Sequence, residues 1–199
     1  VKMEGKEAHS AQPETGISPS YALAELTLLA QQIQAKYDFP EAYALAVPVY
    51  NQMGVQASGI SPARGEVHFT LRSACPETVD KMWRDIQTHS VTIATKYGLT
   101  TGFEAREAFA GTVNAELGFD LIRRAAEQID QPFVTLDHPF RWGEDFGELT
   151  SRYKGAMFGL GAGIGQPDLH NPDYDFPDDI IMLGVEVFAA LINLADEQL

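Results

Sequence analysis

The hydrophobic pattern of the first 110 residues constrains the fold more than any other feature of this sequence. Apolar residues alternate in some segments, as in strands, and recur every three or four residues in others, as in helices. In order, the pattern predicts strand, helix, strand, strand, helix and strand over residues 1–7, 19–37, 42–53, 66–72, 76–97 and 99–110. This βαββαβ order predicts a four-stranded antiparallel sheet with both helices on one face, the ferredoxin-like arrangement.

The pattern changes around residues 111–114, so we predict one domain over residues 1–112 and a second over residues 113–199. The last helix of the second domain is apolar at nearly every position, and it is therefore expected to be largely buried. The helices predicted there cover 115–130 and 180–194, and the strands cover 132–136 and 156–160. The pattern therefore predicts an α+β domain over residues 1–112, followed by a second domain of helices and short strands.

Composition excludes several classes of protein. The 199 residues carry a formal net charge of −14, which argues against nucleic acid and membranes as partners. No apolar run reaches the roughly 18 residues that a membrane span needs. Cys75 is the single cysteine, so no internal disulfide can form, and a cytoplasmic location is expected. Because Cys75 lies at a predicted turn between strand and helix, we expect a small apolar thiol rather than a nucleophile.

The twelve residues from Asp168 to Asp179 hold one histidine and five acids. Pro172 and Pro177 exclude a regular helix, so the segment is predicted to be a loop held against the helix that follows. A neutral imidazole near carboxylates on such a loop suits a divalent cation, which makes His170 a candidate metal ligand. The alternative is a capping loop whose acids are only solvated.

Two adjacent acids, Glu144 and Asp145, lie between aromatic residues in W-G-E-D-F. Such carboxylates can share a proton, bind a metal or cap a helix, and from the residues alone the cap is favoured. A glycine-rich run at 159–165 suggests a dinucleotide loop at first. However, Gln166 and Pro167 follow it where a helix would have to begin, so that reading is rejected.

Motifs follow one another in a fixed order along nearly the whole chain: G-K-E-A-H-S-A-Q-P, the βαββαβ domain, W-G-E-D-F, G-L-G-A-G and L-H-N-P-D-Y-D-F-P-D-D. In this order they resemble the aminoacylase- and carboxypeptidase-like dimetal amidohydrolases, a metallopeptidase family, and most of all its N-acyl-amino-acid amidohydrolase branch. The resemblance implies that residues 1–112 are a lid and dimerisation domain. Residues 113–199 would be the C-terminal part of an α/β metallo-hydrolase catalytic domain.

The resemblance also implies roles for single residues. His9 matches a histidine that reaches the substrate, commonly in the active site of the partner subunit, although by itself it would pass for a loop histidine. His170 matches a metal ligand, and Glu144 and Asp145 match an element that supports the metal centre or positions groups near it. Arg72 matches an arginine at the end of the lid hairpin, where it would bind a substrate carboxylate or form a surface ion pair.

Two departures from the family pattern affect the expected activity. Gly59 stands where the family usually has asparagine. The resemblance also implies that the other metal ligands and the glutamate that acts as general base belong to an N-terminal half outside this chain. The strand-like start at Val1–Glu7 likewise leads us to expect a fragment.

We therefore expect part of a homodimeric amidohydrolase that uses zinc, manganese or nickel and cleaves N-acyl amino acids or small peptides. The chain alone is expected to be inactive, with an incomplete metal site. Two alternatives belong to other classes. One is a non-catalytic dimerisation or binding module, and the other is an NAD-dependent enzyme, which would need the glycine run to precede a helix.

Overall fold

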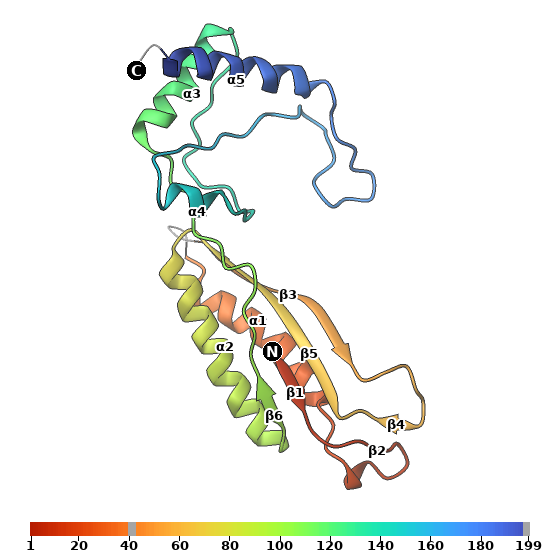
Figure 1. Ribbon diagram of the computed structural model, residues 1–199. Helices are drawn as coiled ribbons and strands as arrows, with labels where there is room; N and C mark the ends of the chain where they lie inside the picture. The colour runs from red at the N-terminus through yellow and green to blue at the C-terminus, as the bar shows by residue number, and fades with distance from the viewer. Residues whose placement is uncertain (40–42, 197–199) are drawn as a thin grey trace. The chain divides into compact units, whose positions relative to one another are not determined.

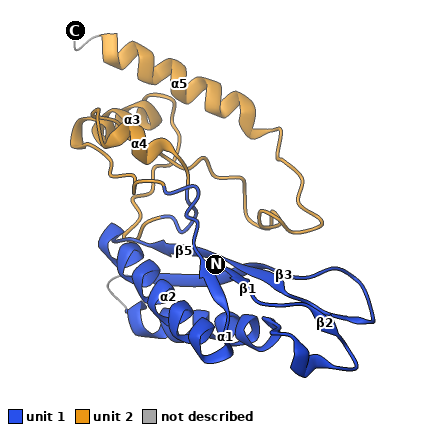
Figure 2. Ribbon diagram, turned by 60° about the horizontal axis from the view of Figure 1, so that its bottom comes forward, with its two compact units in different colours: residues 1–108, 140–143 blue, residues 109–139, 144–199 orange. Residues whose placement is uncertain are grey.

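The computed structural model describes residues 1–39 and 43–196, and within them the fold is a mixed α/β one. The chain divides into two compact units (Figure 2). Unit 1 comprises residues 1–108 and 140–143, and unit 2 comprises residues 109–139 and 144–199. Of the helices in the described ranges, none is long and apolar enough to cross a membrane.

Unit 1 contains a four-stranded sheet with strand order β3-β5-β1-β6, in which all neighbours are antiparallel. Its main elements are β1 (Lys2–Glu4), α1 (Ser20–Tyr37), β3 (Ala44–Met53), β5 (Arg64–Ser73), α2 (Pro76–Tyr97) and β6 (Thr100–Gly102). A two-stranded ribbon of β2 (Ala8–His9) and β4 (Ile60–Ser61) extends from one end of the sheet, and Pro13–Thr15 forms a 3-10 turn beside it. Figure 1 shows both helices on the same face of the sheet.

The core of unit 1 lies between the sheet and the two helices. Alternation along the strands turns Met3 and Val67 inward, where they are fully buried. Leu26 of α1 and Met82 and Ile86 of α2 are fully buried against them. Both helices were predicted almost to the residue. The end of α2 had a clear sequence signal, because Gly98 adopts the left-handed conformation that ends a helix, with φ 69°.

Each helix of unit 1 ends in Lys-Tyr, and both side chains bind a carboxylate of the other helix. Lys36 Nζ and Tyr37 Oη of α1 donate to Asp85 of α2 at 2.6 and 2.9 Å. A second such pair joins α2 to α1, where Lys96 and Tyr97 both donate to Glu25 at 2.5 Å. These two latches fix the helices against each other beyond their apolar contacts.

Two predicted strands of unit 1 are shorter than expected. The strand predicted over 99–110 pairs only at Thr100–Gly102, because its neighbour β1 offers only Lys2–Glu4 for pairing. The strand predicted over 1–7 ends at Glu4, after which the Gly5 N–H donates to the Ala63 carbonyl at 2.7 Å and the chain turns toward β2. In the predicted strand 42–53, residue 42 lies outside the described part of the chain, and β3 begins at Ala44.

Unit 2 contains α3 (Glu116–Gln128), α4 (Phe146–Thr150) and α5 (Ile180–Asp196), and its described residues form no strand. The strands predicted over 132–136 and 156–160 are therefore wrong, and the reason is that neither finds a neighbour with which to pair. Instead, Asn114 bridges to both backbone groups of Met157 at 2.8 Å. This contact ties the start of the unit to its central loop.

The expectation of a largely buried α5 is also wrong. Only Val187, Ala190 and Leu194 are buried, where α5 packs against Ala125 of α3. The remaining apolar side chains of the helix are mostly exposed, including Ile181, Met182, Val185, Phe188 and Ile192. In this structure α5 thus keeps a long apolar face that no other described segment of unit 2 covers.

Candidate functional site

The five predicted site residues divide between the two units. His9 and Arg72 belong to unit 1, and Glu144, Asp145 and His170 belong to unit 2. Within unit 1, His9 pairs with Ile60 beyond the start of β5, whereas Arg72 lies near the end of β5. The strand between them spans roughly 25 Å at about 3.3 Å per residue, so these two side chains do not share one site within the unit.

His9 is an exposed histidine whose ring has a fixed orientation. The Ala11 N–H donates to its Nδ1 at 3.1 Å, and the Ser10 N–H donates to the Gly59 carbonyl at 2.9 Å. Because Nδ1 accepts a hydrogen bond, the neutral ring carries its proton on Nε2 and can donate it outward. A side chain at Gly59 would meet open space, so asparagine would fit there and crowding does not explain the glycine.

Arg72 lies half-buried at the end of β5, opposite Leu45 of β3. Its Nη1 donates to the Arg141 carbonyl at 3.3 Å. Among the residues that the structure describes, no carboxylate lies within ion-pair distance of the guanidinium. Within residues 1–39 and 43–196, Arg72 therefore forms no surface ion pair of the kind that the sequence left open.

Glu144 and Asp145 precede α4, but they do not cap it with their side chains. Asp145 occupies the N-cap position without a side-chain hydrogen bond, and only its carbonyl accepts, from the Glu148 N–H at 2.9 Å. The Oε1 atom of Glu144 is buried and has no hydrogen-bond partner among the described residues. A buried carboxylate oxygen is costly without a donor or cation, which marks Glu144 as a residue suited to bind one.

Glu148 was not singled out from the sequence, although its side chain binds the backbone at residue 110 to helix α4. Its Oε1 accepts the Ala110 N–H at 3.0 Å, and Gly147 packs directly against the Ala110 carbonyl. Any side chain at Gly147 would overlap that carbonyl oxygen. One sequence signal could have pointed to Glu148. It lies within the first turn of a helix that begins after two acids.

His170 lies on an exposed loop with a left-handed backbone, at φ 71°. The carbonyl of Asp168 accepts the Asn171 N–H at 3.0 Å, and the carbonyl of Asn171 accepts the Tyr174 N–H at 3.0 Å. Consecutive turns therefore hold the histidine. Positive φ is uncommon for residues other than glycine and often accompanies a functional constraint.

No three histidine, cysteine, aspartate or glutamate side chains gather into a cation site in the ranges 1–39 and 43–196. The described residues thus do not fit a complete metal centre. His170 is the single residue for which a ligand role is expected, and its role stays a prediction.

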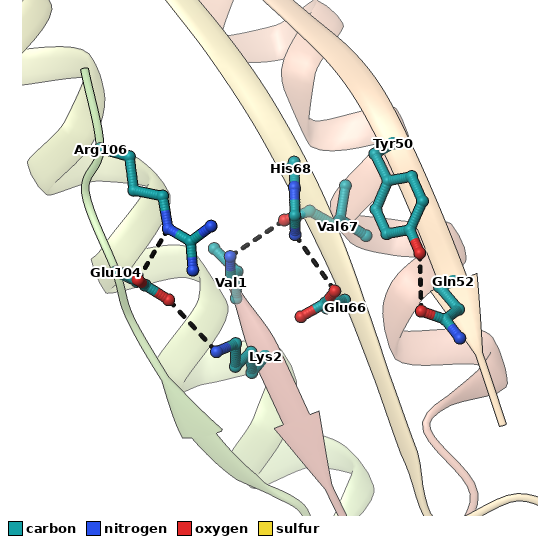
Figure 3. Close-up of polar contacts among 9 residues, drawn as sticks. All are labelled: Val1, Lys2, Tyr50, Gln52, Glu66, Val67, His68, Glu104 and Arg106. Carbon is teal, nitrogen blue, oxygen red and sulfur yellow. Dashed lines mark hydrogen bonds and ion pairs between the residues drawn. The ribbon is translucent and has the colours of Figure 1, made fainter. Parts of the chain in front are cut away.

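The helix-free face of the sheet in unit 1 carries a polar network that was not predicted (Figure 3). His68 Nε2 lies 3.2 Å from Glu66 Oε1, and the His68 ring lies 4.8 Å from that of Tyr50. Beside them Glu104 binds Arg106 and Lys2, and these partners lower the pKa of Glu104 to about 2. The ring contact joins β3 to β5, and Glu104 joins β1 to the segment after β6, so these contacts hold neighbouring parts of the sheet together.

The solved structures that this chain resembles in fold include two named as peptidases. A tripeptidase from Staphylococcus aureus subsp. aureus Mu50 superposes with a TM-score of 0.66 at 16% identity, over 97% of this chain and 49% of the other. Aminopeptidase PepT from Bacillus cereus ATCC 10987 gives a TM-score of 0.62 at 19% identity, over 96% and 49%. These likenesses define the class of fold.

The family model "Peptidase family M20/M25/M40" matches residues 9–194, and the chain belongs to this family. The resemblance inferred from the motifs is thereby confirmed. Among curated relatives, the N-acetyldiaminopimelate deacetylase of Lacticaseibacillus casei BL23 is 25% identical over 185 residues, which cover 92% of this chain and 48% of the relative. The chain thus spans about half the length of the curated relatives that it matches.

Proposed function

We propose that this chain is part of a metal-dependent amidohydrolase that cleaves the amide bond of N-acyl amino acids or small peptides. The observation that carries the proposal is the family match over residues 9–194. In support, the relative from L. casei is named a deacetylase of an N-acetylated compound, and the structural neighbours are named as peptidases. All of these reactions break an amide bond.

Residues 1–112 serve in this proposal as a ferredoxin-like lid and dimerisation domain, and residues 113–199 as the C-terminal part of the catalytic domain. The antiparallel order β3-β5-β1-β6 with two helices supports the first assignment. His9 contributes its outward Nε2–H to the substrate, and Glu144 and Asp145 support the centre that His170 helps to bind. The other ligands of a zinc, manganese or nickel ion come from outside this chain, whose location in the cytoplasm is part of the same proposal.

Hydrolysis of N-acetyl amino acids by the full-length protein tests this function. His9→Ala and His170→Ala are each expected to lower kcat/KM by at least about a hundredfold. His138→Ala is a matched control, since His138 is an exposed histidine whose nearest acid, Asp137, lies 4.0 Å away. Wild-type turnover in both test variants, or no turnover of N-acyl amino acids and dipeptides by any of these proteins, would refute the proposal.

The alternative of a dimerisation module has an observation of its own. Strand β3 lies at an edge of the sheet and exposes Val47, Val49 and Met53. Such an edge favours pairing with a second copy, although Pro48 and the irregular register after it interrupt the strand. Val49→Lys should shift a dimer to monomer in sedimentation velocity, whereas Gln52→Lys on the same strand should shift it less. A monomeric wild-type chain at high concentration would exclude the module.

A further inference from the structure

Residues 140–143, here called the return segment, pack onto unit 1 although they are distant from it in sequence. Tyr43 Oη donates to the Phe140 carbonyl at 3.4 Å, and Arg72 Nη1 donates to the Arg141 carbonyl at 3.3 Å. The Arg141 guanidinium lies over the Tyr43 ring, 5.4 Å from its centroid. Two consecutive backbone carbonyls are therefore held by side chains from the sheet.

The sheet presents these two side chains together. Ala44 pairs with Ser73 and Leu45 with Arg72, so the start of β3 and the end of β5 lie side by side. Ser73 Oγ donates to the Tyr43 carbonyl at 2.9 Å, which fixes the residue just before β3. The anchor thus lies at the start of β3 and the end of β5.

The return segment is stiffened from within as well. The rings of Phe140 and Trp142 stack at 4.1 Å between centroids with 17° between their planes. The chain then passes so close to Arg72 that a Cβ at Gly143 would lie 3.1 Å from Nη1. Glu144, with its unpartnered buried oxygen, is the next residue along the chain.

We propose that Tyr43 and Arg72 form a clasp that fixes the return segment and thereby the backbone from which Glu144 and Asp145 follow. Arg72 is then a positioning residue, whether or not its remaining N–H donors also bind a substrate carboxylate. The importance of the clasp for catalysis rests on the function proposed above for Glu144 and Asp145. The clasp itself rests only on contacts within unit 1.

Trypsin cleavage after Arg141 measures the clasp directly in the 199-residue chain. Arg72→Met and Tyr43→Phe each remove one donor, and Arg72→Met should speed cleavage at Arg141 about tenfold. Arg64→Met is the matched control, because Arg64 starts the same strand but contacts Glu4 and not the return segment. Cleavage at Arg84, in the middle of α2, reports any general loss of structure.

The clasp is supported if cleavage at Arg141 rises in Arg72→Met and Tyr43→Phe while cleavage at Arg84 stays constant. An unchanged rate at Arg141 in both variants, or a rise that Arg84 follows in both, would overturn it. Because this readout needs no catalysis, an inactive protein with a faster cut at Arg141 would count against the proposed function and leave the clasp standing.

Kinetics of the full-length protein separate positioning from carboxylate binding. A positioning role predicts that Arg72→Met lowers kcat to a similar extent for an N-acyl amino acid and for its C-terminal amide, with little change in KM. Binding of the substrate carboxylate instead predicts a higher KM for the acid alone. That second pattern with kcat unchanged for both substrates would overturn the assignment of Arg72 as a positioning residue.

Discussion

Gly147 shows how much can depend on one residue without a side chain. It is the second residue of α4 and lies against Ala110, and the Glu148 side chain accepts the Ala110 N–H from the same turn. The glycine lets the two backbones approach closely enough for that bond. Gly143 and Gly147 lie on either side of the two acids. A side chain at Gly143 would approach the Arg72 guanidinium, whereas one at Gly147 would overlap a backbone carbonyl. The sequence alone does not show this difference.

Gly147→Ala is expected to destabilise unit 2 by about 1–3 kcal/mol, because the added methyl group overlaps the Ala110 carbonyl and forces the backbones apart. Gly161→Ala is the control, since a Cβ there has nothing within 4 Å. Denaturant unfolding of both variants measures the difference. Equal midpoints for the two variants would contradict the close packing of α4 on residue 110.

At the scale of elements, the two latches between α1 and α2 should make the folding of unit 1 depend on pH. Hydrogen bonds from Lys36 and Lys96 lower the pKa values of Asp85 and Glu25 in the folded state. A carboxyl group with a lowered pKa stabilises the fold above its ordinary pKa near 4, and this contribution is lost as pH falls through the lowered value. Glu104 behaves in the same way, and its contribution is lost as pH falls from its ordinary pKa to the lowered pKa of about 2.

The melting temperature should therefore be constant near neutral pH and fall between about pH 5 and pH 2. Asp85→Asn should lower it at pH 7 by roughly 4–8 °C, corresponding to about 1 kcal/mol, and should flatten its acid dependence. Melting curves followed by circular dichroism measure both effects. An unchanged acid dependence in the variant would show that the latch at Asp85 does not contribute to stability.

Elements with local signals were predicted well, and elements that need distant partners were not. Helix α2 runs from Pro76 to Tyr97 as predicted, since a proline starts it and Gly98 ends it. The strand predicted over 156–160 does not form, because sequence periodicity cannot supply the neighbouring strand.

Similarly, the candidate residues His9 and His170 could be selected from motifs. The contact of Arg72 with the Arg141 carbonyl could not, because it joins residues 69 positions apart through a backbone group.

At the scale of the molecule, the apolar face of α5 should cause association. Val185, Phe188 and Ile192 recur at helical spacing and are exposed within unit 2. Phe188→Lys should reduce concentration-dependent association in sedimentation velocity, whereas Glu186→Lys, on the same helix, should not. If Val49→Lys reduces this association and Phe188→Lys does not, the chains associate through the edge of β3 and not through α5.

The family match covers almost the whole chain, yet the described residues gather no set of cation ligands. These two facts agree if the metal centre is completed by residues outside this chain, with His170 as the contribution from residues 113–199.

Metal content after dialysis against metal-free buffer tests this claim most directly, by elemental analysis of the full-length protein, its His170→Ala variant and the 199-residue chain. We expect the full-length protein to retain zinc, manganese or nickel, the His170→Ala variant to lose at least one equivalent, and the 199-residue chain to retain none. Full metal content in His170→Ala, or a tightly held ion in the 199-residue chain, would contradict it.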